Sequence, residues 1–71
     1  MTRIRTNRGE FTDDQFEALA NEYFRQSGVT RLPAPRHVDL VLSHYEVSLR
    51  QLDWARAVAQ RALAKIVVRD R

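Results

Sequence analysis

The chain has 71 residues, no cysteine and a mean hydropathy of −0.50. This length supports one domain near the lower limit of independent folding, because such a chain buries only about 60% of its extended surface. The lack of cysteine excludes disulfide bonds and thiolate metal sites. No apolar run reaches the ~20 residues of a membrane span and no signal-peptide core is present, so we expect a cytoplasmic protein without membrane contact.

Positive charge dominates, with a net charge of +3 and an isoelectric point near 10.2. Eleven of the twelve basic residues are arginine, whose planar guanidinium binds phosphate or carboxylate in a fork. This usage favours nucleic acid or an acidic protein surface as partner, and GC-rich coding explains it equally well. Residues 1–9 carry only positive side chains, whereas residues 10–22 hold five acids and no base. The pattern indicates separate basic and acidic surfaces.

The chain begins with a segment that lacks periodicity. We interpret residues 1–9, MTRIRTNRG, as a flexible basic arm. A first helix is expected from about 13 to 27, because Thr12 and Gln15 have the spacing of a capping box and Gly28 suits a left-handed helix end. Apolar residues at intervals of three and four predict one buried stripe on this helix. Its members are Phe16, Leu19, Ala20, Tyr23 and Phe24.

Two more helices are expected. The second runs from Pro35 to about Tyr45, since proline suits the first helical position. The third runs from about 49 to 68, roughly 30 Å, with Ser48 as its cap and Gln51 completing a second capping box. The buried face of the second helix is expected to hold Val38, Val41, Leu42 and Tyr45. The inward stripe of the third is expected to hold Leu52, Ala55, Ala59, Ala62, Leu63 and Ile66.

The third helix also carries a second stripe, nearly opposite the first. Its members are Arg50, Trp54, Ala57, Arg61, Ala64 and Val68. The only tryptophan therefore falls where a three-helix core leaves the helix exposed, which indicates a contact surface for DNA or for another helix. Alternatively, Trp54 has a structural role and lies over the edge of the first helix or the arm. We find no strand pattern, so the expected class is all-α, with residues 10–71 as a single three-helix domain.

The order of arm, three helices and a long final helix resembles a tri-helical helix-turn-helix domain, and most closely its homeodomain-like branch. TRIRTNR resembles the arm that enters the minor groove, FTDDQFEALANEY is similar to the first helix, and VSLRQL to the opening of the recognition helix. The likeness covers most of residues 3–66. The sequence departs at Val58, where homeodomains carry the Asn that reads adenine, and at Ala55, where they carry a core Trp. Glu46 also replaces the Gly common in prokaryotic turns.

This resemblance implies a third helix in the major groove and an arm on phosphates or in the minor groove. The expected DNA-binding residues are Arg3, Arg5, Arg8, Arg50, Gln51, Trp54, Ala57 and Arg61. The leading hypothesis is a small DNA-binding protein, a transcriptional regulator or accessory factor, that acts as a homodimer on a short two-fold site of double-stranded DNA.

The alternative hypothesis is a non-enzymatic protein-interaction module, either a homo-oligomer or an inhibitor or adaptor of a larger machine. Small apolar side chains on the second stripe would let another helix approach closely. The expected interface residues are Trp54, Ala57, Val58, Ala64 and Val68.

We expect no catalytic, cofactor or metal site and no small-molecule substrate. His37 and His44 are two helical turns apart, about 10 Å, which is too far to share a metal ion. The acids at the start of the first helix are explained by capping and by the helix dipole. With only two glycines, the chain has no phosphate-binding loop. We therefore predict that the protein is not an enzyme.

Overall fold

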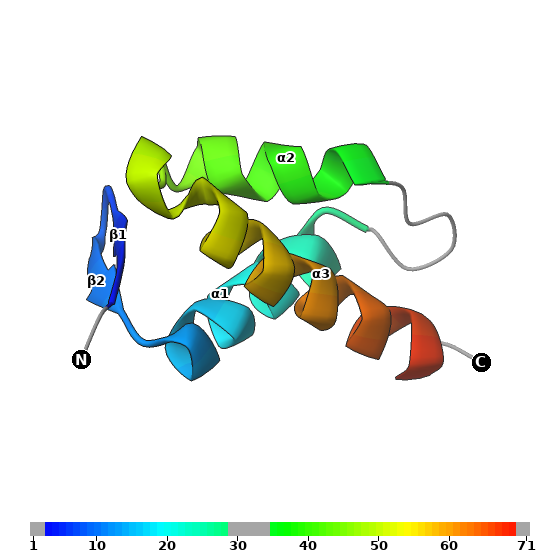
Figure 1. The fold of residues 1–71 in the computed structure, drawn as a ribbon. Coiled ribbons are helices and arrows are strands. Elements are labelled where there is room, and N and C mark those ends of the chain that lie inside the picture. Colours follow the sequence, from blue (N-terminus) through cyan, green and yellow to red (C-terminus); the bar gives the residue numbers. More distant parts are fainter. Residues whose placement is uncertain (1–2, 29–34, 70–71) are drawn as a thin grey trace.

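The computed structural model describes residues 3–28 and 35–69, with side chains described for 3–28 and 36–66. These residues form a small antiparallel hairpin and three helices (Figure 1). The elements are β1 (Ile4–Thr6), β2 (Gly9–Phe11), α1 (Asp13–Gln26), α2 (Pro35–His44), the 3-10 turn η1 (Leu49–Gln51) and α3 (Leu52–Arg69). α3 packs most extensively against α1 and then against α2. No helix of the described ranges is long and apolar enough to cross a membrane.

The capping box of α1 is confirmed. The Thr12 hydroxyl accepts the Gln15 N–H at 3.2 Å, and the Gln15 side-chain oxygen accepts the Thr12 N–H at 3.0 Å. Two N–H groups that the first turn leaves unpaired are thereby satisfied. At the other end Gly28 has a φ of +74°, the expected left-handed conformation. The observed bounds of α1 and α2 lie within a residue of those predicted, whereas the predicted third helix opens with the 3-10 turn η1 and becomes α-helical only at Leu52.

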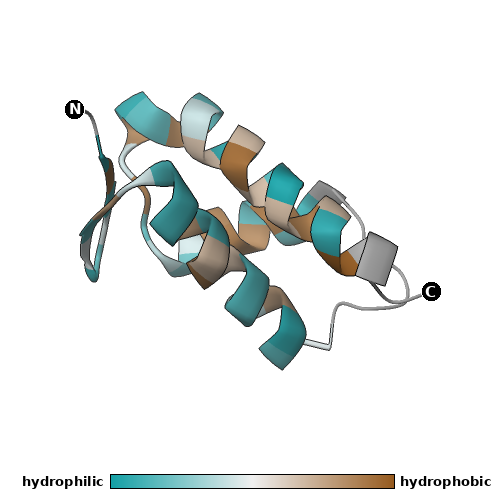
Figure 2. Ribbon diagram, turned by 90° about the horizontal axis from the view of Figure 1, so that it is seen from below, coloured by the Kyte–Doolittle hydropathy of each residue, from teal (hydrophilic) through white to brown (hydrophobic). Residues whose placement is uncertain are grey.

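The core lies between the three helices, and the expected inward faces supply nearly all of it. Hydrophobic and hydrophilic residues alternate along each helix in Figure 2, as amphipathic helices require. The buried hydrophobic residues are Ile4, Phe16, Ala20, Phe24, Val38, Val41, Leu42, Tyr45, Val47, Ala55, Val58, Ala59, Ala62 and Ile66. Leu19, Tyr23, Leu52 and Leu63 are partly buried against them. A mostly helical domain is therefore confirmed, and its helix-turn-helix identity stays a prediction.

The N-terminal segment corrects both the predicted flexible arm and the all-α class. Ile4 pairs with Phe11 and Arg5 with Glu10 across β1 and β2, and the Arg5 and Glu10 side chains form an ion pair at 3.0 Å. Ile4 is fully buried in the core, which anchors the hairpin to the helices. Each strand has three residues, too few to produce a visible alternation of apolar and polar residues.

The second predicted capping box is wrong. The Ser48 side chain makes no cap hydrogen bond, and the Gln51 amide is directed to β1 instead. Its oxygen accepts the Arg5 N–H at 2.7 Å, and its NH₂ donates to the Arg3 carbonyl at 2.5 Å. The Ser48 N–H adds a bond to the Arg5 carbonyl at 3.2 Å. The start of the third helix therefore binds the backbone of β1, as a neighbouring strand would.

The tip of the hairpin binds the turn between α2 and η1. The Asn7 N–H donates to the Tyr45 carbonyl at 2.8 Å, and its side-chain NH₂ donates to the His44 carbonyl at 3.2 Å and to the Glu46 carboxylate at 3.1 Å. Glu46 has a φ of +49°, a conformation that costs a residue with a Cβ about 1–2 kcal/mol. We call the contacts made by Gln51 and Asn7 the hairpin clasp. It holds the turn in place from outside the helical body (Figure 1).

Replacing Gln51→Ala is expected to lower the free energy of unfolding by about 1–2 kcal/mol, because the Arg5 N–H of β1 and the Arg3 carbonyl just before β1 lose their partners. Urea unfolding followed by circular dichroism measures the difference. Gln60→Ala is the matched control, since Gln60 is exposed on α3 and an ordinary surface substitution changes stability by less than about 0.5 kcal/mol. Equal stabilities of the two variants would show that the Gln51 bonds contribute nothing to stability.

Candidate interaction surface

The residues predicted to bind DNA do not form one surface. Ala57 and Arg50 are exposed as expected, and Ala64 beside them is exposed as well. The outermost line of α3, which we call the outer line, is opposite its buried face and consists of Asp53, Ala57, Gln60 and Ala64. It contains no basic residue, which weakens the expectation that this face lies along a phosphate backbone.

Three of the residues predicted to contact DNA or a protein partner are not free on the surface. Trp54 is half-buried and packs against the core, which agrees with the structural alternative for this side chain. Val58 is 2% exposed and is part of the core, so its assignment to an interface is wrong. The Gln51 amide is occupied in the hairpin clasp. The side chain of Val68, also predicted at the interface, lies outside the described residues.

Arg61 belongs to an ion cluster that joins α3 to α1. Glu17 on α1 is almost buried and forms an ion pair with Arg61 at 2.9 Å. Lys65 binds the other carboxylate oxygen of Glu17. The hydrogen bond from Lys65, together with that from Arg61, holds the pKa of Glu17 below 4.5 against the opposing effect of burial. Arg61 thus neutralises an internal carboxylate, and it is not free to read a base without breaking that pair.

Three other arginines remain available at the hairpin end of the molecule. Arg3, Arg8 and Arg50 are exposed, and within the described residues they form no ion pair. The bond from Gln51 to the Arg3 carbonyl brings β1 next to the start of the third helix, where Arg50 lies. We call these three arginines the basic end. Arg5 has the same location, but it is paired with Glu10.

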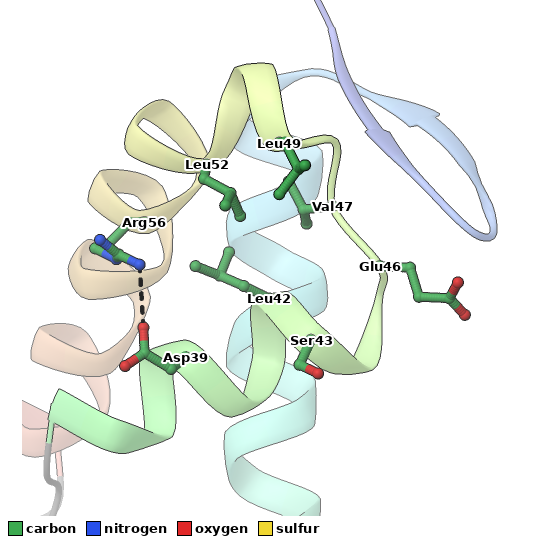
Figure 3. A pocket seen from close by; sticks show the side chains of 8 residues that line it. All are labelled: Asp39, Leu42, Ser43, Glu46, Val47, Leu49, Leu52 and Arg56. Carbon is green, nitrogen blue, oxygen red and sulfur yellow. Dashed lines mark hydrogen bonds and ion pairs between the residues drawn. The ribbon is translucent and has the colours of Figure 1, made fainter.

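A shallow groove of about 350 Å³ lies between α2 and the start of α3 (Figure 3). The lining residues are Asp39, Leu42, Ser43, Glu46, Val47, Leu49, Leu52 and Arg56. Leu42 and Leu52 face each other across its middle in Figure 3, and the Glu46 carboxylate is directed away from it. Asp39 and Arg56 form an ion pair at 3.2 Å on its margin. We call this feature the α2–α3 groove.

Leu49 is the unusual residue of the groove. It is 85% exposed, although it is large and apolar and lies beside Leu42 and Val47, which are buried. Sequence reasoning did not select Leu49 because it falls outside both stripes of the third helix. Its position at the very start of that helix, one residue after the cap, was the only available signal. Single exposed leucines are ordinary, but one that continues an apolar groove forms a patch suited to binding.

Residues suited to metal binding are not gathered in the described part of the chain, where no three His, Cys, Asp or Glu side chains are placed to hold a metal ion. The His44 ring instead packs on aromatic side chains, with its centroid 4.9 Å from that of Tyr23 and 4.8 Å from that of Tyr45. These contacts give His44 a packing role beside the hairpin clasp.

Comparison with known proteins gives no relative. No family model matches the chain, and no curated protein or solved structure matches it. The resemblance to homeodomain-like domains therefore stays a prediction. The groove, the outer line and the basic end are the features on which a functional proposal depends.

The Glu17 cluster predicts a pH-dependent stability. Because the pKa of Glu17 is lower in the folded than in the unfolded chain, its stabilising effect is present well above the unfolded pKa and is lost as the pH falls through the folded pKa. Glu17→Gln is expected to cost about 1 kcal/mol of unfolding free energy at pH 7, and the difference from the parent should shrink below pH 4.5.

Urea unfolding at several pH values measures this effect. Asp39→Asn is the control, because its carboxylate is 66% exposed and its ion pair with Arg56 is therefore weak. A Glu17→Gln variant whose deficit stays constant down to acid pH would contradict the assignment.

Proposed function

We propose that this chain is a non-enzymatic binding domain whose α2–α3 groove receives apolar side chains of a protein partner. The observation that carries the proposal is Leu49, 85% exposed beside the buried Leu42. Burying one such leucine side chain contributes roughly 1.5–3 kcal/mol. The groove thus offers a binding anchor at Leu49, the more exposed of the two large apolar side chains on the described surface, the other being Leu40. The proposal includes a cytoplasmic location, with which the lack of cysteine agrees.

The shape of the groove favours side chains over a small molecule as its occupant. Its volume of about 350 Å³ is at the lower end for small-molecule sites, which are usually enclosed. An open apolar trough with charged residues at its margin is typical of a surface that receives one face of an amphipathic helix. Asp39 and Arg56 at that margin provide charges that help select the partner.

The position of Leu49 is supported by the hairpin clasp. Gln51 and the Ser48 N–H are both bonded to β1, and Leu49 lies between them in the chain. A short segment held at both sides loses little conformational freedom when a partner binds. The clasp therefore prepares the anchor for binding as well as stabilising the fold.

A second candidate function is binding to double-stranded DNA, which the basic end favours. Arg3, Arg8 and Arg50 are exposed and have no partner among the described ion pairs. They suit phosphate contacts, which position a protein on DNA without reading its sequence. Sequence-specific regulation of transcription would need base contacts, and of the predicted base-contacting residues only Arg50 and Ala57 remain exposed and unoccupied.

The groove is tested by selecting binders from a library of helical peptides and measuring their affinity by calorimetry. Leu49→Asp is expected to weaken the selected peptides at least about tenfold, because a charge replaces the apolar anchor. Leu40→Asp is the matched control, since Leu40 is 51% exposed on α2 but does not line the groove. Circular dichroism verifies that both variants fold. Equal loss in both variants, or no loss in either, would contradict the groove as the site.

DNA binding is tested by its salt dependence. If the three arginines of the basic end contact phosphates, log Kd should rise with log salt with a slope of about 3, and each single replacement by Ala should lower that slope by about one. Arg25→Ala is the control, because Arg25 is exposed near the end of α1, outside the basic end. A slope that Arg50→Ala leaves unchanged would remove Arg50 from the contact surface.

A further inference from the structure

We infer that the occupant of the α2–α3 groove is a second copy of this chain, placed so that Leu49 of each copy enters the groove of the other. The inference rests on the proposed function, since it requires the groove to bind protein. It shares Ala57 and Ala64 with the dimer surface expected from the sequence, but it replaces the half-buried Trp54 and the buried Val58 with the groove around Leu49. Three properties of the groove support this occupant.

The first property is that the projecting side chain, Leu49, and the groove that would receive it lie on the same surface of the chain. Leu49 is exposed at one end of the groove, and Leu42 and Leu52 line its middle (Figure 3). A two-fold dimer uses the same patch on both copies, so that patch must contain both the inserted group and its receptor. The α2–α3 groove meets this requirement without any other part of the chain.

The second property is charge. Asp39 and Arg56 stand on the same margin with opposite signs, and their side chains are 66% and 45% exposed. A two-fold axis that passes between the two side chains brings Asp39 of one copy near Arg56 of the other, so the pairs can be exchanged between copies without leaving a charge unpaired. A partner of a single charge sign would face repulsion from one of them. The margin is therefore self-complementary.

The third property is the area that lies beside the groove. A standard stable interface covers roughly 800 Å² on each partner, which is about one sixth of the 5060 Å² surface of this chain. The outer line of α3 lies on the same helix as Leu52 and Arg56 of the groove, and its Ala57 and Ala64 are small and exposed. Small side chains allow two helices to approach to about 8–10 Å. A dimer of standard size therefore needs the outer line as well as the groove.

Sedimentation equilibrium of the full chain, from about 1 μM to 1 mM, tests the inference. The parent protein is expected to show a reversible monomer–dimer equilibrium. Leu49→Asp should raise the dimer Kd at least about tenfold, whereas Leu40→Asp should leave it unchanged. Both sites are exposed, so neither replacement disturbs the core, and circular dichroism verifies the fold.

A charge exchange tests the geometry independently. Asp39→Arg and Arg56→Asp should each weaken self-association, because each variant places like charges across the two-fold interface. A mixture of the two variants should associate more tightly than either alone, because each copy then supplies the charge that the other lacks. This rescue requires a dimer in which positions 39 and 56 of the two copies lie close together.

The outcomes separate the inference from the proposed function. If the protein stays monomeric throughout but its groove still binds selected helical peptides, the inference of a dimer is wrong and the proposed binding function of the groove stands. A monomer that also binds no peptide overturns both. A dimer that survives Leu49→Asp, or charge variants that show no rescue when mixed, places the contact elsewhere and overturns the inference.

Discussion

The amide of Gln51 is the contact on which the arrangement of this small domain depends. A two-stranded hairpin is marginally stable alone and leaves the backbone groups of its outer edge unpaired. Gln51 supplies one acceptor and one donor to β1, so a single side chain replaces part of a third strand. The same bonds fix the start of the third helix. The exposure of Leu49 and the form of the α2–α3 groove follow from this attachment.

The helices were predictable because their signals are local. The capping box of α1, the apolar spacing of each helix and Gly28 depend on residues within a few positions of one another. The hairpin was not predictable, since β1 has one buried residue, Ile4, and no period can be read from three positions. Thr12–Gln15 and Ser48–Gln51 show the limit of such reasoning. Their spacing is identical, yet Gln51 binds a strand that is distant in the chain, and tertiary contact overrides the local motif.

The candidate site was less predictable than the fold, because surface chemistry depends on partners far apart in sequence. Arg61 was expected on an outward face, but Glu17, 44 residues earlier, neutralises it. Trp54 lies near the boundary between exposed and buried faces, where a rotation of the helix by a few tens of degrees decides its environment. Leu49 belongs to neither helical stripe, so periodicity gave it no role. Only the packed structure relates it to the groove.

The hairpin clasp also has a consequence for the order of events during synthesis. The Arg5–Gln51 bond joins residues 46 positions apart. Closing so long a loop costs conformational entropy, whereas forming a helix from neighbouring residues does not require such a closure. A chain emerging from the ribosome exposes Ile4 and the edge of β1 well before Gln51 is available. Until the third helix begins to leave the exit tunnel, this first segment has an open strand edge and no core to enter. Within this domain, the hairpin is therefore the segment that waits longest for its tertiary partner.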